Sequence, residues 1–118
     1  MNSQSNIILA GDSHNSWFSN LYNKNKSFVG IEVGAPAISS PSFGDSFKDA
    51  TASVENAFIE ENKDLIWVNG KYMGYVSMDI YENHVDVNFK YVTTVKSRNY
   101  QSIKPITFRV EHNKPYAV

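Results

Sequence analysis

Residues 75–91 (YVSMDIYENHVDVNFKY) carry the clearest structural pattern in the chain. Apolar side chains alternate with polar ones in two runs, first at Val76, Met78 and Ile80 and then at Val85, Val87, Phe89 and Tyr91. A period of two is typical of strands with one buried face, and the short link at residues 82–83 indicates an antiparallel hairpin.

The segments on either side extend this pattern. Alternation at residues 106–110 predicts a last strand, and the tail over residues 113–118 is expected to be frayed. Short apolar runs predict three further strands, at residues 7–10, 28–33 and 65–68, the first of them buried. We expect a short helix or a structured loop over residues 12–22 and a loop over residues 34–43.

One segment has the period of a helix instead. Residues 46–61 place Phe47, Ala50, Val54, Ala57 and Phe58 on one apolar stripe. Ser46 is suited to cap this helix, and Asp49 falls in its first turn, where an acidic side chain is favourable. The sequence therefore predicts an α/β chain, α+β-like in its mainly antiparallel strands, with one main helix.

The composition fits one small folded domain. The chain has 118 residues, and its 42% hydrophobic content is enough to build a core. The formal net charge of −1 argues against a dedicated nucleic-acid binder, and the apolar runs are too short to span a membrane. Cysteine is absent, which excludes disulfides and thiolate metal sites. Residues 1–6 lack the basic and apolar regions of a signal peptide, so the compartment stays open.

The polar loop after the first predicted strand concentrates the chemistry of the chain. Asp12 and His14 are two residues apart, so an extended backbone points both side chains the same way. A carboxylate and an imidazole on one side suit a divalent metal, and Gly11 allows the chain to turn. The alternative is a solvated loop in which Asp12 caps a following helix. Asn15 is a candidate contact to a substrate oxygen, or else a simple turn residue.

A different chemistry uses the same loop. Gly11, Asp12 and Ser13 after a strand are similar to the nucleophile segment of the Gly-Asp-Ser esterases, in which Ser13 would attack an acyl carbon. That chemistry requires an Asp-x-x-His pair near the C-terminus, and neither His84 nor His112 has this spacing.

Four segments, in order, resemble the alkaline phosphatase D (PhoD-like) family. They are residues 8–17, with Gly-Asp-x-His at 11–14; residues 29–33, followed by a serine loop at 37–41; residues 62–68, followed by Gly-Tyr-Val at 74–76; and residues 86–94. The resemblance implies the metallo-dependent phosphatase fold, an αββα sandwich. It also implies hydrolysis of phosphomonoesters and phosphodiesters at a multi-metal centre, with calcium and iron as family metals. Asp12 and His14 would be metal ligands, and a metal-activated water would be the nucleophile.

The chain resembles only the C-terminal part of that family. The motifs that hold the remaining metal ligands lie upstream in the family and have no counterpart here. We therefore expect residues 1–118 to be a single-domain fragment that needs the missing N-terminal part of the phosphatase domain and has little activity alone. A non-catalytic β-rich interaction module is the alternative. A truncated sheet predicts self-association. The family is often secreted or periplasmic.

Overall fold

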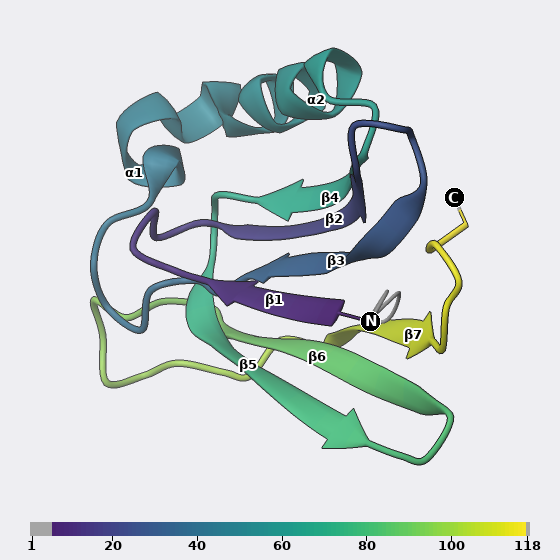
Figure 1. Cartoon of the computed structure of the whole chain (residues 1–118). Helices are drawn as coiled ribbons and strands as arrows, with labels where there is room; N and C mark the ends of the chain where they lie inside the picture. Colours follow the sequence, from purple (N-terminus) through teal and green to yellow (C-terminus); the bar gives the residue numbers. More distant parts are fainter. Residues whose placement is uncertain (1–5, 118) are drawn as a thin grey trace.

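The computed structural model describes residues 6–117, which fold into two packed β-sheets with helices against one of them (Figure 1). The four-stranded sheet has the order β1-β3-β2-β4 and consists of β1 (Asn6–Ala10), β2 (Ser16–Tyr22), β3 (Phe28–Gly34) and β4 (Leu65–Asn69). The three-stranded sheet has the order β5-β6-β7 and consists of β5 (Met73–Ile80), β6 (His84–Val92) and β7 (Ile106–Glu111). Among these strands β1 and β3 are parallel and the other pairs are antiparallel, which confirms the mixed, mainly antiparallel fold.

The core lies between the two sheets, where aromatic side chains from both meet. Phe18 of β2 is fully buried and stacks on Phe108 of β7, with ring centroids 4.3 Å apart. Trp67 of β4 packs on Phe89 of β6 at 4.7 Å. The buried residues of β6 are Val87, Phe89 and Tyr91, which confirms the alternation that the sequence shows there.

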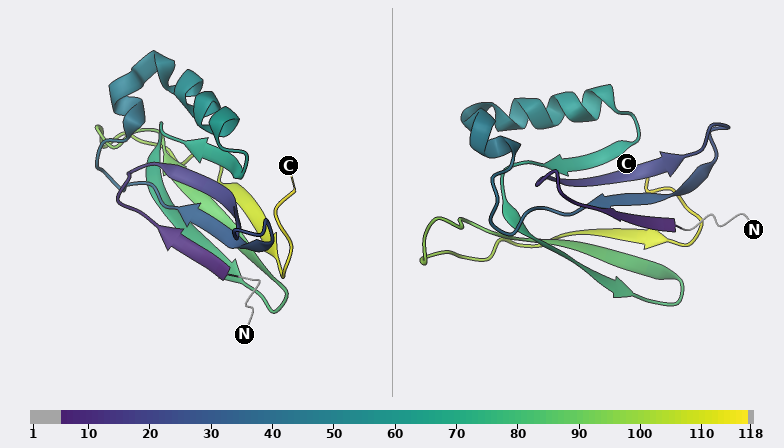
Figure 2. Two further views of the ribbon diagram at one scale, coloured as in Figure 1. Left: turned by 45° about the horizontal axis from the view of Figure 1, so that its top comes forward. Right: turned by 60° about the vertical axis from the view of Figure 1, so that its left-hand side comes forward.

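The helices form one layer on the outer face of the four-stranded sheet, alongside β4 (Figure 2). The order of layers is therefore helix, sheet, sheet. In residues 6–117 no helix covers the outer face of the three-stranded sheet, so the chain supplies three of the four layers of an αββα sandwich. No helix in this range is long and apolar enough to cross a membrane.

The helical segment is divided, which corrects the single helix expected over residues 46–61. It consists of α1 (Phe43–Phe47), the 3₁₀ turn η1 (Lys48–Ala50) and α2 (Thr51–Glu61). Lys48 has a φ of 48°, outside the right-handed helical region, and this separates the first turn from the rest. The segment starts after Ser42 rather than Ser46, because the Ser42 N–H donates to the Asp45 carboxylate at 3.0 Å.

Residues 16–22 form a central strand, so the expectation of a short helix or loop over residues 12–22 is wrong. Two polar residues, Ser16 and Asn20, point into the core from β2 and interrupt the alternation that marks a strand. Both have partners: the Tyr91 hydroxyl donates to Ser16 Oγ at 2.6 Å, and Asn20 exchanges two hydrogen bonds with the Tyr116 backbone. Burial raises the pKa of Tyr91, so its hydroxyl remains a donor.

Both ends of the chain differ from expectation. β1 lies at a sheet edge rather than in the interior, with Ile8 49% and Leu9 61% exposed. The tail that the sequence predicts to be frayed is held at Tyr116, whose ring packs edge-on against Phe18 and Phe108, each at 5.3 Å. Val118, the end of that tail, lies outside the described residues.

Candidate functional site

The loop of residues 11–15 follows the carboxyl end of β1. Because β1 is parallel to β3, this end of the sheet is where α/β folds usually place functional loops. The backbone turns tightly: the Ser13 N–H donates to the Gly11 carbonyl at 2.8 Å, and φ is 66° at Asp12 and 63° at His14. The backbone between Asp12 and His14 is therefore not extended, contrary to the expectation from the sequence. The two-residue spacing does not determine where the two side chains point.

The strain of this turn falls on the candidate ligands and not on glycine. Gly11, expected to allow the turn, has no positive φ, whereas Asp12 and His14 both do. Aspartate and histidine tolerate the left-handed region better than most residues, but it still has a cost. Lys26, Lys48 and Asn113 also have a positive φ, so the backbone conformation does not by itself single out this loop.

His14 has a defined orientation. It is half-buried, and its Nδ1 lies 2.9 Å from the carbonyl oxygen of Pro41. A carbonyl oxygen only accepts, so Nδ1 carries a proton and donates it. The lone pair of the neutral ring is then on Nε2. Metal-binding histidines are commonly fixed in this way, with the second nitrogen donating to a backbone carbonyl.

The loop is also fastened to the start of α1. Asn15 Oδ1 accepts the Phe43 N–H at 3.1 Å. Next to it, the Ser42 hydroxyl donates to the Gly70 carbonyl, and the Gly70 N–H donates to the Glu55 carboxylate at 2.8 Å. The loops at residues 11–15, 35–42 and 69–72 are therefore joined at one end of the sandwich, the left end in Figure 1.

The donor set at this end fits a metal only in part. Asp12 is exposed, and with His14 it offers one carboxylate and one imidazole. In residues 6–117 no group of three or more His, Cys, Asp or Glu side chains is placed to hold a metal ion. A groove of about 730 Å³ starts beside the loop at Ser13 and Asn15 and runs between the four-stranded sheet and α2.

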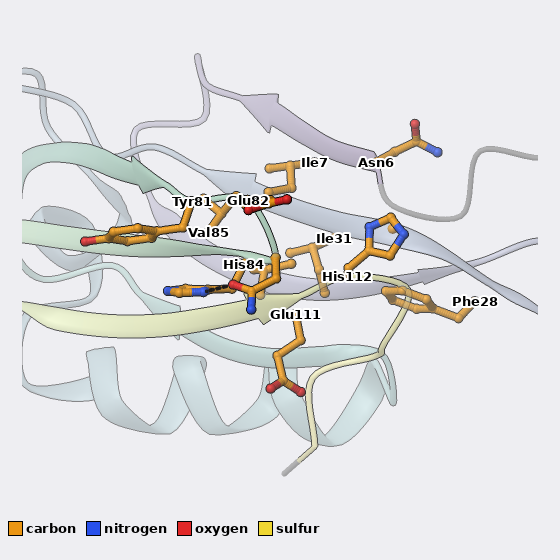
Figure 3. A pocket seen from close by; sticks show the side chains of 13 residues that line it. Asn6, Ile7, Phe28, Ile31, Tyr81, Glu82, His84, Val85, Glu111 and His112 are labelled. Carbon is orange, nitrogen blue, oxygen red and sulfur yellow. Dashed lines mark hydrogen bonds between the residues drawn. The ribbon is translucent and has the colours of Figure 1, made fainter.

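Another group of titratable side chains lies at the opposite end of the sandwich, around the β5–β6 hairpin. A pocket of about 180 Å³ lies there. His84, His112, Glu82 and Glu111 are among its lining residues (Figure 3). Their side chains point apart. His84 stacks on Tyr81 with ring centroids 4.5 Å apart, and its Nδ1 lies 2.7 Å from Asn83 Oδ1. These residues do not converge on a ligand.

This arrangement does not support the esterase alternative. Ser13 lies beyond the carboxyl end of β1, whereas His84 and His112 line the pocket beside Asn6, at the other end of that strand. The neighbouring His14 directs its Nδ1 to Pro41. His84 directs its Nδ1 to Asn83.

His84 and Asp86 have the same two-residue spacing as Asp12 and His14, but the Asp86 carboxylate is already paired with Arg109. Arg109 Nε and Nη2 donate to its two carboxylate oxygens at 2.7 and 2.9 Å. The Arg109 guanidinium lowers the pKa of Asp86 from its ordinary value of 3.8. A carboxylate whose pKa is lower in the folded chain stabilises the fold above its ordinary pKa, and this contribution disappears as the pH falls through the folded value.

We therefore expect Asp86→Asn to destabilise the chain slightly at pH 7, where the ion pair is complete. The difference from the native chain should shrink as the pH falls below about 4, because protonation then removes the same charge from the native protein. Urea unfolding at several pH values checks this, with Asp64→Asn as a control for the loss of one surface charge. An unchanged difference at low pH would contradict it.

The comparisons with known proteins agree with the resemblance seen in the sequence. No curated protein matches the chain. The solved structure of PhoD matches with a TM-score of 0.66 at 19% identity, over 90% of this chain and 20% of that one. At this identity the match shows the fold, and the chain spans about a fifth of the length of that protein. The family model for PhoD-like phosphatases matches residues 1–89. Since this is most of its length, the chain belongs to the PhoD-like phosphatase family.

Proposed function

We propose that this chain supplies part of the metal centre of a phosphoester hydrolase, with Asp12 and His14 as two of the ligands. The observation that carries the proposal is the hydrogen bond from His14 Nδ1 to Pro41, because it leaves Nε2 as the donor atom of a fixed imidazole. Membership of a phosphatase family and the position of the loop after a parallel strand support the same assignment.

The metal ions would polarise the phosphoryl oxygens and lower the pKa of a bound water. The contribution of the chain itself is orientation. Pro41 holds the His14 ring in one tautomer, and Phe43 engages Asn15 Oδ1. The NH₂ group of Asn15 would donate to a phosphate oxygen.

We further propose that residues 1–118 are the C-terminal portion of a longer phosphatase domain. The chain spans a fifth of the PhoD structure, and the described residues offer two ligands where a catalytic metal needs at least three from protein. The remaining ligands would come from the rest of that domain. The isolated chain is accordingly expected to bind metal loosely and to have little or no hydrolytic activity.

Metal binding by the isolated chain tests the ligand assignment directly. Mn²⁺ is titrated into the chain, and paramagnetic broadening of the backbone amide signals is measured. The signals of residues 11–15 should broaden at the lowest Mn²⁺ concentrations. Asp12→Asn and His14→Ala should each weaken this by at least about tenfold, since even partners outside the ligand set contribute 10- to 100-fold. His84→Ala is the matched control and should leave the broadening at residues 11–15 unchanged.

Two outcomes would count against the proposal. Broadening centred on His84 and His112 would move the site to the other end of the sandwich. If the amide signals of residues 11–15 were not selectively broadened, the non-catalytic module would be favoured. An oriented imidazole and a nearby carboxylate should bind Mn²⁺ at least weakly.

A further inference from the structure

A second groove, of about 510 Å³, lies between the loop of residues 93–101, the start of β5 and Ile38. Its walls carry an unusual share of apolar surface in water: Ile38 is 76% exposed, Tyr100 57%, Tyr75 54% and Val95 38%. Two tyrosines and two aliphatic side chains open to solvent in one groove offer flat, apolar contact. Exposed apolar clusters of this kind mark binding sites more often than scattered single residues do.

The two charged side chains that line the groove, Lys96 and Arg98, are both basic. A third cation, Lys90, lies with its Nζ 5.8 Å from the centre of the Tyr75 ring. Lys96 forms an ion pair at 3.4 Å with Asp45, which lies outside the lining, whereas Arg98 forms no ion pair with another residue of the range 6–117. The groove is therefore complementary to an anionic ligand with an apolar part.

The loop that forms one wall is held in shape by its own hydrogen bonds. Its base is closed by Thr93 and Gln101, whose backbone groups pair at 2.9 Å. Within it, the Lys96 N–H donates to the Thr94 hydroxyl and the Asn99 N–H to the Ser97 hydroxyl, both at 3.1 Å. A pre-organised wall loses little entropy when a ligand binds.

The groove lies at the same end of the molecule as the candidate metal loop. Residues 37–41 link the two: the Gly74 N–H donates to the Ala37 carbonyl at 3.0 Å beside the groove, and the Pro41 carbonyl accepts from His14. Ile38 and Pro41 are three residues apart, so the chain between them spans at most ~11 Å. The loop at residues 93–101 and the loop after β1 also lie at the same end in both views of Figure 2.

We propose that this groove binds a ring-bearing organic group that is esterified to the phosphate of the substrate. Tyr75 and Tyr100 would contact the ring, and Arg98 would pair with an anionic oxygen. The inference rests on the proposed function, because it places the leaving group of the substrate next to the metal loop. A phosphoester with a ring would then be preferred to one with a short alkyl group.

The test is binding of phenyl phosphate to the metal-free chain, followed by amide chemical shifts, with inorganic phosphate and phenol as the two partial ligands. Phenyl phosphate should shift Gly74, Thr94 and Tyr100 and bind more tightly than either partial ligand. Tyr100→Ala should weaken binding by about tenfold, and Arg98→Gln by about threefold. The matched controls are Tyr81→Ala, a tyrosine as exposed as Tyr75 at the other end of β5, and Lys24→Gln; both should bind as the native chain does.

Three results would overturn the proposal: shifts outside the groove, equal binding of inorganic phosphate, or native affinity in Tyr100→Ala. Concentration-dependent broadening of the groove signals without ligand would also overturn it, because a second copy of the chain would then occupy the groove. The titration contains no metal. Its failure would therefore leave Asp12 and His14 untouched, while failure of the Mn²⁺ titration would leave the groove in place.

Discussion

In the longer phosphatase domain that we propose, Asp12→Asn and His14→Ala should each lower kcat/KM for a chromogenic phosphodiester by at least about 100-fold. Loss of a group that merely orients a metal ligand costs 10- to 100-fold, so loss of the ligand itself should cost at least the upper value. The His14 ring is oriented before any ligand binds, because its Nδ1 donates to the Pro41 carbonyl. Steady-state kinetics with added calcium, iron, manganese or zinc measure the effect.

Ser13→Ala is the matched control, because Ser13 lies between the two residues in the same exposed turn. If a water is the nucleophile, this variant should keep activity within about threefold of the native value. Metal-independent activity that disappears in Ser13→Ala would restore the serine esterase. Normal activity in His14→Ala would show that the imidazole is not a ligand.

The parts of the fold that the sequence predicts are those in which each strand has one buried face. In β6 the buried residues Val87, Phe89 and Tyr91 alternate with polar residues that face away from the core. This period of two allows the hairpin to be predicted from the sequence. β2 was not predictable in this way. Its inward residues Ser16 and Asn20 are polar and are satisfied by Tyr91 and Tyr116, which are 75 and 96 residues further along the chain. Local pattern holds no information about partners at that distance.

The candidate site was also predictable only in part. The sequence identifies the two candidate ligand types and places them in the loop after the first strand. The sequence gives no sign that Pro41 orients His14, because this contact uses a backbone carbonyl 27 residues away that any residue could provide. The sequence also suggests that Gly11 makes the turn, whereas the positive φ values are at Asp12 and His14.

Phe18→Ala should cost about 3–5 kcal/mol of unfolding free energy, the largest stability effect we expect from a single core truncation. The Phe18 ring is fully buried between the sheets, where it stacks on Phe108 and meets the edge of Tyr116. Its removal therefore leaves a cavity in the sheet-to-sheet contact and frees the C-terminal tail. A domain of 118 residues has a total stability of about 6–18 kcal/mol, so this loss is a large fraction of the whole.

Urea unfolding of the isolated chain measures this loss, and Phe58→Ala is the comparison. Phe58 is 44% exposed on α2, so less apolar surface returns to water when it is truncated, and the loss should be clearly smaller. If Phe18→Ala lost no more than Phe58→Ala, the two sheets would not be held together by this aromatic cluster. The sandwich would then depend on the rest of the proposed phosphatase domain, because the core seen here could not account for its stability.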